Sequence, residues 1–100
     1  MITAEYKMKA KVWVYPGFAA WRFLSVPIKQ TKEITKVFGA LKRGWGSLPV
    51  LATIGKTSWK TSIFPDKKTQ TFLLPVKKDV REKEGIIDDK ITTFSIKILV

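Results

Sequence analysis

A chain of 100 residues with 45% hydrophobic and 12% aromatic residues holds enough apolar material for one folded domain, which we expect to span residues 1–100. It contains neither cysteine nor histidine, which excludes disulfides, thiolate metal sites, thiol nucleophiles and histidine bases. The formal net charge of +11 favours polyanionic partners such as nucleic acid, an anionic membrane surface or a phosphorylated ligand.

Two strands are predicted in the first quarter of the chain. Residues 6–14 alternate between apolar and mostly charged side chains, which is the period of a half-buried strand. Residues 20–26 form a second strand candidate, with Trp21 and Phe23 on one face and Arg22 and Leu24 on the other.

A helix is predicted to begin after Pro27. Its apolar positions recur at helical spacing and so should face the core: Ile34, Val37, Phe38 and Leu41. Gly39 is expected to end this helix, and a loop with two glycines around Trp45 follows.

The next stretch, IGKTSWKTS at residues 54–62, resembles the end of a phosphate-binding loop. That loop also requires a glycine five residues before the Gly-Lys pair and a helix after it. Val50 occupies the glycine position, and alternating β-branched and aromatic residues follow. The stretch is therefore interpreted as a hairpin turning at Gly55-Lys56, with Trp59, Thr61 and Ile63 sharing one face of the return strand.

The rest of the chain is predicted to form a turn at Pro65-Asp66, a short strand at residues 72–74, a helix over residues 77–84 stopped by Gly85, and a final strand over residues 91–100. Together these elements indicate a mainly β fold, a small barrel of about six to seven short strands capped by two short helices.

The sequence offers few residues that could support catalysis. Asp88 and Asp89 are adjacent on a loop and should point apart, and a Ser-Lys pair around Lys60 has no recognisable third group to orient it. We therefore expect no enzyme, no cofactor and no metal.

The N-terminus lacks the apolar core of a signal peptide, and the uncharged run at 44–55 is shorter than the roughly 20 residues of a membrane span. A cytoplasmic protein is expected.

Three stretches, AWRFLSVP, KRGWGSLPVLATIGKTSWKTSIFP and LLPVKKDVREKEGI, occur in this order over nearly the whole chain. They resemble the bacterial family of domain of unknown function 1905 (DUF1905). The resemblance implies a double-split β-barrel with helical caps and no established activity. More weakly, residues 80–96 are similar to the end of swapped-hairpin AbrB/MazE-like domains, which form interleaved dimers and bind DNA; whether the present chain is a monomer or a dimer stays open.

The expected function is that of a non-enzymatic, basic binding module for an anionic ligand or partner. Its candidate ligand-binding residues lie on the hairpin, the second helix and the glycine loop: Lys60, Thr61, Ser62, Arg81, Lys42, Arg43 and Trp45. The family pattern places an arginine at Arg81, although a structural ion pair with a nearby carboxylate would also explain it. The hydroxyl and lysine row of the hairpin is equally typical of a solvated sheet face.

Three alternatives accompany this hypothesis. The first is nucleic-acid binding through the phosphate backbone, which the lysine excess favours and the presence of only three arginines weakens. The second is a protein-interaction or fusion-partner domain. The third is that the charge reflects a lysine-rich organism and carries no function.

Overall fold

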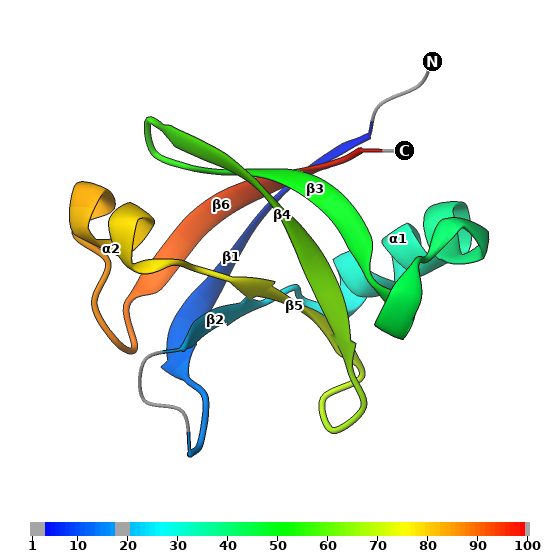
Figure 1. Ribbon diagram of the computed structural model, residues 1–100, viewed down its shortest axis with the longest axis horizontal. Helices are drawn as coiled ribbons and strands as arrows, with labels where there is room; N and C mark the ends of the chain where they lie inside the picture. The colour runs from blue at the N-terminus through cyan, green and yellow to red at the C-terminus, as the bar shows by residue number, and fades with distance from the viewer. Residues whose placement is uncertain (1–3, 18–20, 100) are drawn as a thin grey trace.

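The computed structural model describes residues 4–17 and 21–99, and within these it shows six strands joined in one closed barrel (Figure 1). All neighbouring strands pair antiparallel, in the order β1-β2-β5-β4-β3-β6, and β6 pairs with β1 to close the barrel. The strands are β1 (Glu5–Val14), β2 (Arg22–Ser25), β3 (Leu48–Ile54), β4 (Thr57–Asp66), β5 (Thr71–Pro75) and β6 (Ile91–Ile98). The predicted fold class, a small and mainly β barrel with two helices, is confirmed.

The helices lie at two places on the outside of this barrel (Figure 1). They are α1 (Ile28–Phe38), which is followed by the 3₁₀ turns η1 (Gly39–Leu41) and η2 (Gly44–Gly46), and α2 (Lys78–Glu84). As predicted, α1 follows Pro27, and α2 ends at Gly85, which has the left-handed φ of 62°. Gly39 ends α1 as its C-cap, as predicted, although its φ of −57° is right-handed and the chain continues into η1.

The apolar stripe predicted for the first helix is partly wrong. Ile34 and Phe38 are buried, but Val37 and Leu41 are 62% and 51% exposed. The α-helix contacts the barrel through a narrow face that also contains the buried Thr31. Since the chain tightens into η1 at Gly39, Leu41 does not continue that face.

The predicted hairpin is confirmed. Ile54 pairs with Thr57, so the turn consists of Gly55 and Lys56 alone. Gly55 has a φ of +57°, as in a two-residue turn that requires glycine at its first position. A strand follows the turn, so the geometry of a phosphate-binding loop is absent at Lys56.

The core fills the barrel with alternate residues from the strands. Val12, Leu24, Val50 and Ile96 are fully buried, as the period-two patterns predict. Strand β4 runs through Pro65 to Asp66, beyond the turn that was predicted there, because β5 pairs with this end of the strand. That pairing also positions the site described next.

Candidate functional site

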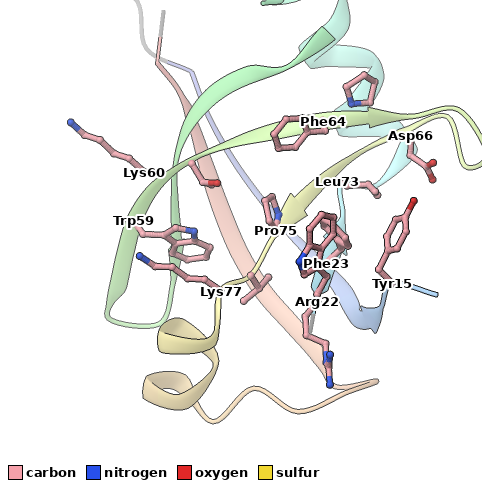
Figure 2. A pocket seen from close by; sticks show the side chains of 14 residues that line it. Tyr15, Arg22, Phe23, Trp59, Lys60, Phe64, Asp66, Leu73, Pro75 and Lys77 are labelled. Carbon is pink, nitrogen blue, oxygen red and sulfur yellow. The ribbon is translucent and has the colours of Figure 1, made fainter. Parts of the chain in front are cut away.

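A groove with a cavity volume of about 650 Å³ lies on the outside of the barrel, over β2, β4, β5 and the residues that lead into α2 (Figure 2). This volume is within the range of small-molecule binding sites, about 300–1,000 Å³. Its lining is largely apolar and includes Tyr15, Trp21, Phe23, Phe64, Leu73 and Pro75. The groove is thus a concave and mainly aromatic surface.

The groove forms where β4 and β5 separate. Phe64 pairs with Leu73, and continuing this register would place Thr61 opposite Val76. No described pair joins β4 to β5 before Phe64, where β4 pairs with β3 on its other edge, and Val76 donates its backbone N–H to the carbonyl of Arg22 in β2 at 2.9 Å. The two strands therefore diverge, and Thr61 and Val76 line opposite sides of the opening.

A cluster of aromatic rings extends the groove over the outer face of β1 and β2. Trp13 pairs with Phe23 across these strands, and its ring lies 6.0 Å from that of Tyr15 between centroids. The indole N–H of Trp13 donates to the Ser25 hydroxyl at 3.0 Å. This bond anchors the cluster to the sheet, because a partly buried indole N–H needs an acceptor.

Trp21, Phe64 and Tyr15 are the most exposed rings of the groove, at 55%, 39% and 36%. Sequence analysis placed Trp21 and Phe23 on one face of their strand but did not determine which face is outside. Leu24 is fully buried in the core cluster, so the opposite face, with Phe23, looks outward.

Cationic side chains flank the apolar surface. Lys60 and Lys77 lie at the end of the groove beside Trp59, whereas Tyr15 and Asp66 lie at the other end (Figure 2). The third cation of the lining, Arg22, has its guanidinium Nε 2.6 Å from the carboxylate of Asp88. Positive charge therefore exceeds negative charge among the lining residues.

The model of a family described as domain of unknown function (DUF1905) matches residues 9–96. The chain belongs to the DUF1905 family. Comparison with curated proteins yields no match. Every residue that lines the groove falls inside the DUF1905 segment, so the groove is built from the part of the chain that defines membership.

In this DUF1905 protein, two of the seven expected site residues meet in the groove, namely Lys60 and Thr61. Ser62 is half-buried on the same strand, and Arg81 is half-buried on α2; neither lines the groove. Arg22 and Lys77 do line it and were not among the expected residues. Nothing in the spacing of the sequence predicts that they line the same groove as Lys60, because strand pairing brings these residues to one surface.

The remaining expected residues lie in or before the η2 turn. The Lys42 ammonium sits 5.4 Å from the ring centre of Phe72 and borders a smaller cavity of about 180 Å³. Arg43 is exposed. The side chain of Trp45 lies outside the part of the chain that the structure describes, so its place among the candidate ligand-binding residues stays a prediction.

Three hydroxyl groups near the turn of the hairpin bond within the protein. Thr53 and Ser58 share a hydrogen bond of 2.8 Å across β3 and β4, and the Thr57 hydroxyl donates to Glu84 at 2.6 Å. Among the described residues, no group of three or more acidic, histidine or cysteine side chains gathers as a metal site. Neither described α-helix has the length and hydropathy to cross a membrane.

Proposed function

We propose that this protein is a non-enzymatic binding module whose groove takes a ligand with a flat apolar part and an anionic group. The observation that carries the proposal is the joint presence of exposed rings, above all Trp21, and of the two lysines Lys60 and Lys77 among the residues that line one cavity. Aromatic and apolar surface supplies most of the binding energy in such sites, while a few charged groups orient the ligand.

The lining also supports a binding role over catalysis. Its described hydroxyl groups belong to Tyr15 and Thr61, and its carboxylate, Asp66, accepts a hydrogen bond from Thr69 at 2.8 Å. A nucleophile needs a neighbouring base and a third group that orients the base. Among the described hydrogen bonds, none joins the Thr61 hydroxyl to a base, and the proposal therefore assigns the groove to holding a ligand.

The test uses two fluorescent probes that differ by one sulfonate: 1-anilinonaphthalene-8-sulfonate and the neutral N-phenyl-1-naphthylamine. We expect the sulfonate to bind more tightly. Trp21→Ala should weaken both probes, whereas Lys60→Gln with Lys77→Gln should weaken only the sulfonate. The control is Lys29→Gln with Lys32→Gln, two exposed lysines of α1 with the same total charge loss. Equal binding by the groove and control variants would contradict the proposal.

A second candidate function is binding of nucleic acid through the phosphate backbone alone, which the net charge of +11 favours. The expected result is an affinity for duplex DNA that falls steeply with salt, with a logarithmic slope near −0.9 for each neutralised phosphate. Fluorescence anisotropy at low and near-physiological salt measures it. A flat salt dependence would remove this candidate.

A role in protein interaction is favoured by Val37 and Leu41, which are 62% and 51% exposed on α1 and η1. Exposed apolar side chains that lie close together commonly mark contact surfaces. Light scattering of the wild type and of Val37→Gln with Leu41→Gln tests it. A dimer that dissociates in the double variant would support this role, and a monomer in both would argue against self-association.

A further inference from the structure

We infer that the ligand of the groove is single-stranded nucleic acid, with bases stacked on its exposed rings and phosphates held by its flanking lysines. The inference rests on the proposed function, since it takes the groove as the binding site. It names the chemical class of the ligand and goes beyond backbone binding, because the bases themselves contact the protein.

The rings of the groove offer exposed aromatic surface to a flat ligand. Neighbouring rings lie close together, with centroids 6.1 Å apart for Tyr15 and Trp21 and 6.2 Å apart for Trp21 and Phe23. Rings at this separation pack against each other, and both pairs meet edge to face, with interplanar angles of 64° and 82°. Trp21 keeps 55% of its area exposed, so its ring can offer a face on which a base stacks.

A second exposed ring lies across the groove. Phe64, on β4, is 39% exposed and pairs with the buried Leu73 of β5. Each aromatic ring can stack with a base of any sequence, and such stacking contributes about 1–3 kcal/mol per base. Rings from two separate parts of the sheet therefore suit successive bases of one strand.

Lysines lie near both ends of this surface. Lys60 and Lys77 are at one end of the groove, and Asp66 at the other end is followed by the exposed Lys67 and Lys68. A strand lying along the groove would place phosphates near each lysine group. Lysine binds phosphate as a point charge without reading base edges, so the expected recognition tolerates many sequences.

The same features favour single strands over duplexes. In a duplex the bases are stacked on one another and cannot reach Trp21 or Phe64, whereas the faces of unpaired bases are free to stack on aromatic side chains. The net charge of +11 supplies attraction for either form. Contact between the bases and the aromatic rings is thus what distinguishes this mode of binding from binding through charge alone.

The experiment compares a short labelled oligo(dT) strand with a duplex of equal length by fluorescence anisotropy, and follows tryptophan quenching in parallel. We expect tighter binding of the single strand, with quenching. Trp21→Ala should weaken it at least about fivefold, the loss of roughly 1 kcal/mol of stacking. Lys60→Gln with Lys77→Gln should weaken it more than the matched control, Lys29→Gln with Lys32→Gln, although both variants lose the same charge.

Equal losses in the two double variants, or tighter binding of the duplex, would overturn the inference. Thermal unfolding of each variant shows that it is folded, and Trp21→Phe, which keeps a ring, should retain more affinity than Trp21→Ala. If oligo(dT) does not bind while the naphthalene sulfonate binds the groove, this inference fails and the proposed function stands. If neither binds, both fail.

Discussion

The hydroxyl of Thr57, at the start of β4, donates a hydrogen bond of 2.6 Å to the carboxylate of Glu84, at the end of α2. This bond joins the tip of the β3–β4 hairpin to a helix that follows it by more than twenty residues in the chain. Lys77, which precedes the same helix, lines the groove. The bond therefore helps to hold one side of the groove against the barrel.

Replacing Thr57 by valine should lower the free energy of unfolding by about 1–2 kcal/mol, since a hydrogen bond to a charged group is lost and the half-buried Glu84 carboxylate loses its donor. Urea unfolding measures the change. Thr93→Val is the control, because Thr93 is an exposed strand residue of β6. A loss no greater than that of the control would show that the bond contributes nothing.

Comparing alanine variants at Gly55 and Gly85 distinguishes the cost of backbone strain from the cost of a steric clash. Gly55 and Gly85 have nearly equal left-handed φ angles, +57° and +62°. A Cβ at Gly85 would meet no atom within 4 Å, whereas one at Gly55 would overlap the Glu84 carboxylate. We expect Gly85→Ala to cost about 1–2 kcal/mol from strain alone, and Gly55→Ala to cost more.

The difference between these two variants should become smaller when Glu84 is also replaced by alanine, because the clash with its carboxylate is then removed. Urea unfolding of all four proteins tests this. If Gly55→Ala and Gly85→Ala cost the same with Glu84 present, the carboxylate moves away without loss, and the packing of α2 on the turn is weaker than the structure indicates.

Thr31 links α1 to the sheet through its buried hydroxyl. The hydroxyl donates to the Val26 carbonyl at 3.1 Å and accepts from the Phe72 N–H at 3.2 Å. Thr31→Val keeps the shape but leaves a buried backbone N–H without its acceptor, which should cost about 1–3 kcal/mol. Thr31→Ser keeps the hydroxyl and should cost about 0.8 kcal/mol for the lost methyl group.

The order of the two Thr31 variants is the decisive result. Chemical unfolding should find serine less destabilising than valine, although valine is closer in shape to threonine. The reverse order would mean that packing, and not the two hydrogen bonds, sets the choice of residue at this position.

Burial raises the pKa of the Tyr6 hydroxyl above its ordinary value of 10.0, and the negative charge of Glu33 adds to the rise. Because the folded protein holds this proton more tightly than the unfolded chain, its stabilising effect is complete below pH ~10 and is lost as pH rises from there through the folded pKa. The stability of the wild type relative to Tyr6→Phe should therefore fall above pH ~10.

Tyrosinate absorbance in a Tyr15→Phe background follows the Tyr6 titration directly. Glu33→Gln removes the smaller of the two causes, so the pKa should move part of the way back toward its ordinary value. A Tyr6 titration that Glu33→Gln leaves unchanged would show that burial alone raises the pKa.

Local patterns accounted for most of the secondary structure. The alternation of β1, the glycine turn at Gly55 and the left-handed stop at Gly85 each depend on a few neighbouring residues, and all three were predicted correctly. The exposure of Val37 was not, because the helical period shows which residues share a face but not how wide a face the barrel covers.

Such local patterns did not predict the groove. Phe23 and Leu24 are adjacent and both apolar, so alternation alone did not show which one faces outward. Lys60 was an expected site residue, but Lys77 follows it by seventeen residues and lines the same groove only because β5 pairs with β4 from Phe64 to Asp66 and the two strands separate before Phe64.

Composition already limited the chemistry of this protein, because a chain with no histidine, no cysteine and a charge of +11 lacks the usual bases and thiol ligands and attracts anions. The order of the sequence motifs indicated the DUF1905 family, and the match of the family model to residues 9–96 confirms that the chain belongs to it. The tertiary structure alone decided where ligands can meet the surface. Strand pairing brings distant residues together, and the divergence of β4 from β5 leaves an aromatic groove between them.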